Sequence, residues 1–407
     1  MDKNFILQIG GGKESLPALL CAKNKGFKVV VLDKDPSCYC RKLADEFVHA
    51  SVYNAEEALE AIKKSDFQNF IAGVFSLGVD APETNATVAH YLNLPGIPIE
   101  AAKICSNKIL MKEYLTQRGI NMPQYKEVHN VDEIVEFSKS VGFPLVIKPA
   151  DSRGARGVLI LKNDINIKEF FDIAIAESKS RRVIIEKYCW GPQISSETII
   201  ANGKAYTFGL SDRNYDRLDE FFPNIIEDGG ELPSRFSMQY SEIINSEVQK
   251  IAHHLNIVNG TIKGDIVIEN SEVKFIEIAP RLSGGYFASH EVPYSTGYNF
   301  LDAALDISIG KKPHVFNNDY TKNKCVVQRY LFAKPGVIED ISIPENIKSD
   351  PDVLYFDVYF KVGTKVQHTI SHPNRGGVIM TTGSNIETAQ KKAQSCLDSI
   401  KIKQRPL

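Results

Sequence analysis

Short apolar runs, separated by polar or glycine-rich breaks, recur along the whole chain, and amphipathic segments lie between several of them. Residues 5–9 and 28–32 are apolar runs that predict buried strands, and residues 16–25 between them predict a helix. A strand, a helix and a strand in this order predict a parallel sheet. Residues 73–76 predict a further strand, so the chain is expected to begin with a Rossmann-like unit.

The pattern changes after a cluster of breaker residues at positions 95–98. Helices are predicted at residues 106–117, 237–255, 300–308 and 387–400. Strands are predicted at residues 143–149, 182–186, 193–201, 205–210, 326–332 and 353–362. Residues 211–236 are mostly polar and predict a long loop of the kind that often forms a lid or a binding loop.

Residues 264–285 contain two apolar runs around a polar break, which predicts a β-hairpin. If the turn spans three residues or the hairpin contains a bulge, Asp265 and Glu277 lie opposite each other on one face. Like charges so placed destabilise a sheet. A divalent cation between them removes that penalty, and Mg²⁺ suits one or two carboxylates combined with substrate phosphates. The alternative is a hairpin whose acids are solvated.

Cations and small residues accompany this hairpin elsewhere in the sequence. Lys148 ends a short apolar strand, where a charge needs a partner. The glycine-bearing loop 151–158 follows at once, and it can either fold over phosphates with its N–H groups or form a plain turn. Lys108 lies in the first turn of a helix, where the dipole does not favour a cation, so an anion is expected nearby. Backbone groups of residues 186–189, where the chain leaves a sheet, can bind a flat ring.

The N-terminal unit also invites a dinucleotide-binding interpretation. Gly10 and Gly12 are followed about 20 residues later by Asp33. Ser15 stands where the third glycine of the fingerprint belongs, so a structural turn is the favoured interpretation. The oxidoreductase that the fingerprint would indicate stays an alternative.

Composition narrows the classes of function. The net charge is −2 and the pI about 6.5, which indicates no general affinity for nucleic acid or acidic lipid. No apolar run approaches the roughly 20 residues needed to cross a bilayer, and the first residues do not resemble a signal peptide. Seven cysteines without CxxC spacing indicate reduced thiols, so a cytoplasmic protein is expected.

Taken in order, these pieces resemble the ATP-grasp enzymes, and the resemblance covers nearly the whole chain. It is carried by Lys108, Lys148 with Pro149, the loop SRGARGV, the segment EKYCWGP, Glu197, Asp265 and the segment IEIAPRLSGG. The chain looks most similar to the branch that holds L-amino acid ligases and purine-pathway ATP-grasp enzymes. The resemblance implies an α/β (α+β) fold with a preATP-grasp domain at 1–104, an ATP-grasp domain at 105–315 whose lid subdomain is 105–190, and a small α+β domain at 316–407.

The resemblance also implies roles for particular residues. Lys108 and Lys148 would contact the phosphates of ATP, under a loop that includes Ser152, Arg153, Gly154 and Gly157. Glu186 and Cys189 would bind the adenine edge through backbone groups, with Lys187 and Tyr188 alongside, and Gln193 would lie at the ribose. Asp265 and Glu277 would hold Mg²⁺, for which Mn²⁺ is an alternative, and Arg281 would steady the transferred phosphoryl group. Glu197 is counted among the nucleotide-binding residues.

Two positions depart from the family pattern. Ala279 stands where many relatives have an asparagine that binds metal, so the number of metal ions is open. Gln193 replaces an acid that many relatives place on the ribose hydroxyls, and its carboxamide can still form hydrogen bonds there without charge assistance.

The activity implied by the resemblance is that of a carboxylate–amine ligase, which forms an amide through an acyl phosphate and releases ADP and phosphate. Arg213, the loop 211–236, Ser283, Gly284, Gly285 and His290 are expected to line the acceptor side. A histidine beside Ser289 and Glu291 is nevertheless more often structural. A carboxylase, a kinase and a non-catalytic nucleotide-binding scaffold are the alternatives. The expected partners are a small carboxylate and a small amine, and a homodimer is expected for an enzyme of this size.

Overall fold

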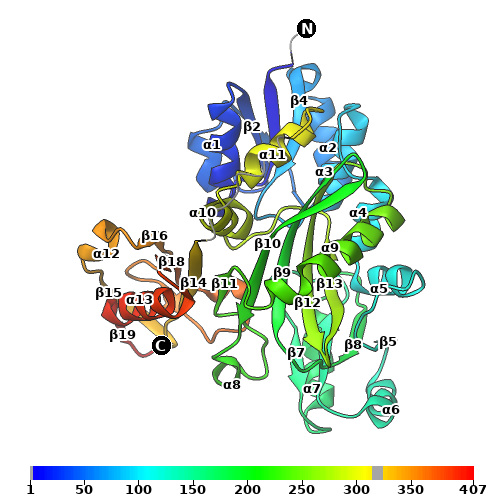
Figure 1. The fold of residues 1–407 in the computed structure, drawn as a ribbon, viewed down its shortest axis with the longest axis vertical. Helices are drawn as coiled ribbons and strands as arrows, with labels where there is room; N and C mark the ends of the chain where they lie inside the picture. The colour runs from blue at the N-terminus through cyan, green and yellow to red at the C-terminus, as the bar shows by residue number, and fades with distance from the viewer. Residues whose placement is uncertain (1–2, 314–323) are drawn as a thin grey trace.

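The structure is a computed structural model that describes residues 3–313 and 324–407. The predicted boundary at residues 315–316 lies outside the described residues. No helix in the described part of the chain is both long and apolar enough to span a bilayer. The elements are arranged around a long central sheet, with the N-terminal segment at the top of Figure 1 and the C-terminal segment at its left.

The first segment forms a parallel sheet in the order β3-β2-β1-β4, as the βαβ pattern predicts. Its strands are β1 (Phe5–Ile9), β2 (Lys28–Asp33), β3 (Glu46–His49) and β4 (Ile71–Ser76). Its helices are α1 (Leu16–Asn24), α2 (Ala55–Lys63) and α3 (Pro82–Tyr91). The strands are buried because helices cover both faces, which explains their nearly continuous apolar runs.

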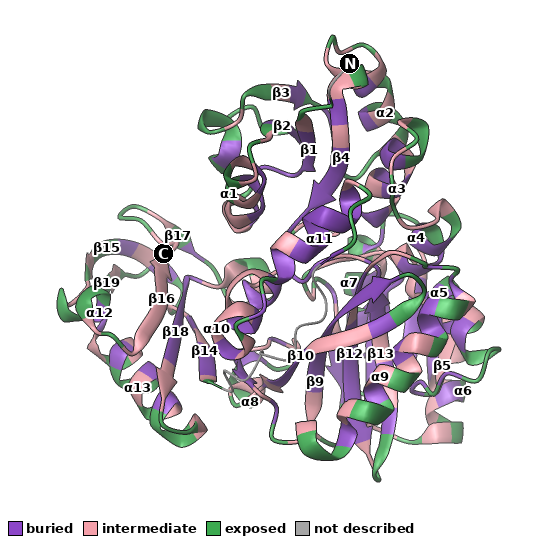
Figure 2. Cartoon of the chain, turned by 45° about the horizontal axis from the view of Figure 1, so that its top comes forward, coloured by how far each residue is buried: buried purple, intermediate pink, exposed green. Residues whose placement is uncertain are grey.

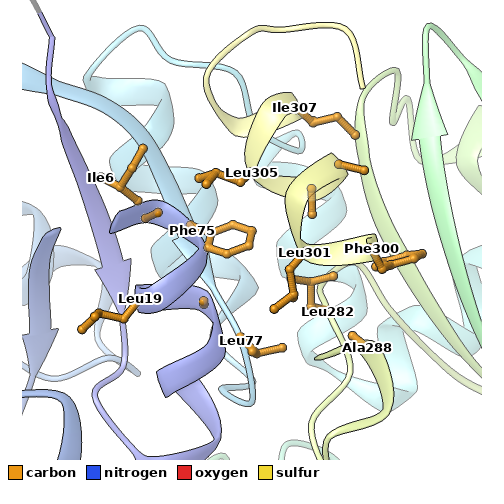
Figure 3. Packing of buried hydrophobic residues seen from close by; sticks show 14 of the residues in the cluster. Ile6, Leu19, Phe75, Leu77, Leu282, Ala288, Phe300, Leu301, Leu305 and Ile307 are labelled. Carbon is orange, nitrogen blue, oxygen red and sulfur yellow. The ribbon is translucent and has the colours of Figure 1, made fainter. Parts of the chain in front are cut away.

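A helix from much later in the chain completes this first unit. In α11 (Phe300–Ser308), Leu301 and Leu305 pack against the same core as Ile6 and Leu19 of the N-terminal segment (Figure 3). Burial of these side chains joins the N-terminal segment to the end of the predicted ATP-grasp region. Because α11 and the N-terminal segment share one core, the loops of the N-terminal segment are held in place beside the loops of the predicted ATP-grasp region.

A second, antiparallel sheet has the order β5-β8-β6-β7. Its strands are β5 (Tyr125–Val128), β6 (Leu145–Pro149), β7 (Leu159–Leu161) and β8 (Val183–Lys187), and its helices are α6 (Val131–Val141) and α7 (Ile167–Glu177). Leucine, isoleucine, valine and phenylalanine side chains form a core between the helices and one face of the sheet. The other face of β6 and β8 is left to face the rest of the molecule.

The central sheet has the order β13-β12-β9-β10-β11-β14-β18-β16. Its strands are β9 (Gln193–Ala201), β10 (Lys204–Asn214), β11 (Gly229–Leu232), β12 (Gly260–Glu269), β13 (Glu272–Ala279), β14 (Cys325–Leu331), β16 (Val353–Val358) and β18 (Gly377–Gly383). Strands of the C-terminal segment thus extend the sheet that carries the hairpin. Figure 2 shows that the middle strands are mostly buried, while the covering helix α9 (Ser237–His254) exposes its outer side.

Shorter elements surround these sheets. The remaining helices are α4 (Ile99–Ser106), α5 (Lys108–Thr116), α8 (Leu218–Phe221), α10 (Val292–Thr296), α12 (Asn346–Ser349) and α13 (Ile386–Ser399). A small antiparallel sheet joins β15 (Gly336–Ser342) to β17 (Lys365–Val366) and β19 (Lys401–Arg405). In α5 the side chain of Asn107 caps the helix by accepting from the N–H groups of Ile109 and Leu110.

The predicted hairpin is confirmed as β12 and β13, joined by the two residues Asn270 and Ser271, both in the left-handed region. Such a turn matches the twist of the strands. A register shift lies between Asp265 and Ile266, and it places Asp265 directly opposite Glu277. Of the two arrangements that would place these acids opposite each other, a three-residue turn or a bulge, the structure contains the bulge.

The prediction of one long loop at residues 211–236 is wrong in part. Strand β10 continues to Asn214, and Gly229–Leu232 form β11 between β10 and β14. Strand β11 pairs with β14, which is about a hundred residues away in sequence, so the local pattern could not reveal this pairing. Two glycines and nearby polar residues make the segment look like a loop.

Candidate functional site

A cavity of about 870 Å³ lies where the sheets and the C-terminal segment meet. Most of the predicted site residues line it: Lys108, Lys148, Ser152, Arg153, Gly154, Glu186, Lys187, Tyr188, Cys189, Gln193, Arg213, Asp265, Glu277, Arg281, Ser283, Gly284 and Gly285. The volume lies within the range of pockets that bury a small ligand. Residues that are far apart in sequence are thus brought together in one place.

Three charged side chains form a buried cluster on one wall of the cavity. Lys148 Nζ donates to Glu186 Oε2 at 2.8 Å, and Lys112 Nζ lies 3.4 Å from Glu186 Oε1. Burial alone would raise the pKa of Glu186, but the two lysines lower it, so the carboxylate is held ionised. Burial lowers the pKa of Lys112, and only Lys148 and Glu186 of the cluster line the cavity, so the Lys148 ammonium is the group there that suits an anionic or lone-pair-bearing ligand.

The segment after β8 offers an edge for a flat ring. Glu186 is paired with Tyr125 of β5 and Val146 of β6, so its backbone lies inside the sheet. The prediction that Glu186 would act through backbone groups therefore needs correction, since its carboxylate is the group available at the cavity. The chain leaves the sheet at Lys187, and Tyr188 and Cys189 continue along the cavity wall.

The glycine-bearing loop is connected to the other side of the cavity by charge. Lys108 Nζ donates to the carbonyl of Ser152 at 2.9 Å, and Arg153 Nε lies 3.5 Å from Asp80 Oδ2. Asp80 also accepts from Arg281 Nε at 3.0 Å. Although burial opposes it, Arg281 and Arg153 lower the pKa of Asp80 to about 2. Asp80 therefore connects Arg153 of the loop to Arg281, and both arginines line the cavity.

The two acids of the hairpin are held by cations as well. Asp265 Oδ1 lies 3.0 Å from Arg213 Nη1, and its Oδ2 lies 2.6 Å from Lys263 Nζ. These cations outweigh burial and lower the pKa of Asp265. Glu277 Oε2 lies 3.6 Å from Lys108 Nζ. Two carboxylates side by side, one of them held ionised, are a donor set that fits Mg²⁺, because hard cations take oxygen ligands.

Three predicted site residues are not brought to the cavity. Gly157, near the end of the loop 151–158, is in the left-handed region, with Pro149 and Glu177 close by. Glu197 is fully buried and accepts the N–H of Ser283 at 3.2 Å, and burial raises its pKa to about 7. Glu197 therefore supports the chain at Ser283, which lines the cavity, and does not itself line the cavity.

His290 is the third of these residues. Its ring packs against those of Tyr286, Tyr294 and Tyr355, and its Nδ1 lies 2.8 Å from Ser289 Oγ. Burial lowers its pKa to about 4, so the ring is neutral at pH 7. This agrees with the structural interpretation that the sequence favoured for a histidine at this position.

The N-terminal fingerprint residues have local roles. Asp33 Oδ2 accepts the N–H of Gly11 at 2.7 Å, and its Oδ1 accepts the N–H of Asp35 at 2.9 Å. A ribose-binding acid would need those oxygens for the ligand. The geometry thus favours the structural turn over the dinucleotide site.

Several residues that line the cavity were not predicted from the sequence. Glu14 accepts the N–H of Gly285 at 2.8 Å, and Glu227 accepts from Arg213 Nη2 at 2.7 Å. From the C-terminal segment, Arg375 donates to the carbonyl of Glu227 at 2.7 Å and lies 3.6 Å from the ring centre of Tyr330. Isolated charges in loops carry no spacing signal, so only the fold reveals them.

Comparisons with known proteins agree with this arrangement. Residues 105–285 match the family described as ATP-grasp domain, and residues 329–405 match L-amino acid ligase C-terminal domain 2. N5-carboxyaminoimidazole ribonucleotide synthase of Staphylococcus saprophyticus is 23% identical over 291 residues, which are 70% of this chain and 73% of that protein.

Two solved structures show the same fold along nearly the whole chain. An L-amino acid ligase from Bacillus licheniformis superimposes with a TM-score of 0.83 at 20% identity, over 100% of both chains. The biotin carboxylase domain of the 2-oxoglutarate carboxylase from Hydrogenobacter thermophilus, solved with MgADP and bicarbonate, gives a TM-score of 0.75 at 16% identity, over 99% of this chain and 91% of that one.

Proposed function

Because the chain has the ATP-grasp fold and carries an ATP-grasp domain, we propose that it is an ATP-dependent ligase that joins a carboxylate to an amine through an acyl phosphate. The observation that carries the proposal is the single cavity in which Lys108, Lys148, Arg281 and the Asp265–Glu277 pair converge. Phosphoryl transfer depends mainly on positioning and on neutralisation of charge, and this set supplies both.

The side chains divide the work as follows. Lys148 and Lys108 hold the phosphates, and the carboxylate of Glu186 and the chain at residues 187–189 receive the adenine. Asp265 and Glu277 would hold Mg²⁺, which neutralises phosphate charge when bound. Arg281, fixed by Asp80, stabilises the negative charge on the transferred phosphoryl group. The loop 151–158 covers the site and excludes water from the activated acid.

The chemistry then runs in two steps. An oxygen of the substrate carboxylate attacks the γ-phosphorus of ATP, and the bond from that phosphorus to the bridging oxygen breaks to release ADP. The amine nitrogen next attacks the acyl carbon, the carbon–oxygen bond to phosphate breaks, and phosphate departs with the electron pair. The match of residues 329–405 to an L-amino acid ligase domain favours an amine as the acceptor.

A direct test is to trap the acyl phosphate with hydroxylamine. The protein is incubated with ATP, Mg²⁺ and a panel of carboxylates, and hydroxamate and ADP are measured together. We expect at least one carboxylate to give both products in equal amounts, and no product after chelation of Mg²⁺. ADP without hydroxamate for every carboxylate, or no ADP at all, would contradict the proposal.

A carboxylase is the second candidate, because the matched relative from Staphylococcus saprophyticus is named as a carboxyaminoimidazole ribonucleotide synthase. Bicarbonate would then replace the organic acid as the group that is phosphorylated. Release of ADP that requires bicarbonate, with no hydroxamate from any organic acid, would favour this candidate.

A further inference from the structure

One buried carboxylate in the cavity has no role in the site described so far. Glu291 ends the helical turn Phe287–Glu291, is 3% exposed, and lines the cavity. Its Oε2 has no hydrogen-bond partner among the described residues. A buried polar atom without a partner is costly, so it points to a group that the ligand-free protein lacks.

The charges around Glu291 do not supply that group. The nearby cation Arg329 is already paired with Glu231 at 2.6 Å, and the nearby Glu227 is paired with Arg213. Within the described part of the chain, Glu227 and Tyr330 also face it, and neither can balance a negative charge. The other acids of this region differ, because Asp80 and Asp265 each have an arginine partner. Glu291 is thus an acid that faces the cavity with no cation assigned to it.

The sheet fixes where this acid lies relative to the phosphoryl-transfer residues. Glu277 pairs with Asp265, Asp265 with Ser195, and Ser195 with Ser211, so the four residues form a row across one face of the central sheet. All four line the cavity. Strands are about 4.8 Å apart, so Ser211 lies about 10 Å from Asp265.

Glu291 lies over the Ser211 end of this row. A Cβ placed on Gly230 would be 3.0 Å from Ser211 Oγ and 3.8 Å from Glu291 Oε2, so both oxygens lie close to the same face of that glycine. The row therefore has the predicted metal acids at one end, and at the other end Ser211 with Glu291, an acid that interacts with Ser211 but has no ion-pair partner among the described residues. A third reactant would enter at the second end.

We propose that Glu291 binds the amine substrate as its ammonium ion and takes a proton from it before the attack on the acyl phosphate. This inference rests on the proposed ligase function and adds to it the proton acceptor and the charge of the acceptor substrate. The ammonium gives one proton to the Glu291 carboxylate and becomes a neutral amine. When the nitrogen–carbon bond forms, the nitrogen loses its second proton to the departing phosphate.

Chemistry and surroundings agree with this assignment. An amine is protonated at neutral pH and cannot attack until it loses a proton, so a base beside it is required. Burial raises the pKa of Glu291 to about 8, so the ionised form that accepts a proton increases as the pH rises through this range, and a bound ammonium favours that form. Tyr330 and Tyr286 also line the cavity, and aromatic rings favour a bound cation.

The test compares the wild-type protein with Glu291→Gln, using two kinds of acceptor. Hydroxylamine is neutral at pH 7 and needs no proton acceptor, whereas the amino acids, tested as a panel of the twenty standard compounds, carry ammonium groups. We expect Glu291→Gln to keep hydroxamate formation within about twofold and to lose amide formation at least a hundredfold. The wild-type rate of amide formation should also rise with pH, and the residual rate of the variant should rise only as free amine appears.

A matched control is Asp228→Asn. Asp228 is also buried and has one oxygen without a hydrogen-bond partner among the described residues, but it does not line the cavity. It should form amide as the wild type does. Folding of all three proteins is compared by thermal unfolding, and Glu291→Gln should be at least as stable as the wild type because a neutral carboxamide replaces a buried acid whose Oε2 has no partner among the described residues.

The remaining outcomes contradict either the role of Glu291 or the ligase proposal itself. Amide formation by Glu291→Gln at the wild-type rate overturns the inference. So does a wild-type protein that reacts with hydroxylamine but with no ammonium-bearing acceptor. If no carboxylate gives hydroxamate even with the wild type, the ligase proposal itself fails, and the two failures are thereby distinguished.

Discussion

Glu277 and Asp265 show how a single side chain can be judged from its neighbours. They face each other across the hairpin, and Lys108 Nζ lies 3.6 Å from Glu277 Oε2, beyond hydrogen-bond distance. We expect Glu277→Gln to lower Mg²⁺-dependent ADP release about a thousandfold, since a charged contact in phosphoryl transfer has this order of effect. Thermal unfolding should change little. The exposed acid of the same strand provides the control, because Glu272→Gln should leave ADP release unchanged; equal rates in both variants would refute the metal assignment.

Glu197 illustrates a residue whose role could not be read from its position in a motif. It is buried, and burial raises its pKa from 4.5 to about 7. The folded state therefore keeps a proton that the unfolded state releases, so this group lowers the stability as the pH rises from about 4.5 through 7. The whole effect is at most about 3 kcal/mol.

Replacing this acid should remove that part of the pH dependence. The difference in the free energy of unfolding, Glu197→Gln minus wild type, should increase by up to about 3 kcal/mol between pH 4 and pH 8. Chemical denaturation at both pH values measures the difference. The KM for ATP should stay the same, because Glu197 does not line the cavity. A large rise in that KM with no change in the pH dependence would restore the nucleotide-binding role.

The loop 151–158 is the element whose backbone matters most. Gly157 has φ +67°, and an added Cβ would lie 2.9 Å from Pro149 Cγ and 3.0 Å from Glu177 Cβ. Gly157→Ala should therefore both strain the backbone, by about 1–2 kcal/mol, and displace the loop. We expect the KM for ATP to rise about tenfold. Gly203→Ala has the same left-handed strain at φ +75° with no atoms within 4 Å, so it should lose stability without a change in KM.

Elements defined by local pattern were predicted well, and those defined by distant partners were not. The hairpin could be predicted with its paired acids, because alternation and a polar turn are local signals. Strand β11 could not, since Gly229–Leu232 become a strand only between β10 and β14. In the same way, Lys148 of β6 could be predicted, but nothing in the sequence pattern distinguishes its buried neighbour Lys112 from the other residues of its helix.

At the scale of the whole molecule, the cavity is built by segments that no single motif describes. The ordered motifs indicated the proposed nucleotide side, whereas Glu14, Glu227, Glu291 and Arg375, which also line the cavity, come from three separate parts of the chain. Their convergence follows from the shared core of α11 with the N-terminal segment and from the extension of the central sheet by β14 and β18. Such convergence depends on packing, which a sequence pattern does not record.

This convergence predicts that the C-terminal segment affects one substrate and not the other. Arg375 donates to the carbonyl of Glu227 and lies against Tyr330, and both of these residues lie near Glu291, the proposed amine-binding acid. Arg375→Ala removes a charged hydrogen bond, which contributes about 1.5–3 kcal/mol. The KM for the acceptor amine should therefore rise about ten- to a hundredfold, while the KM for ATP stays within about twofold.

Arg405→Ala is the control, because Arg405 is an exposed residue of β19 in the same segment. Steady-state kinetics with each substrate varied in turn separate the two effects. If Arg375→Ala raised both KM values equally, the C-terminal segment would act on the stability of the whole cavity, and not on its acceptor side. A change confined to the acceptor would instead mean that the nucleotide end and the acceptor end can be altered independently, as expected when different segments of the chain build them.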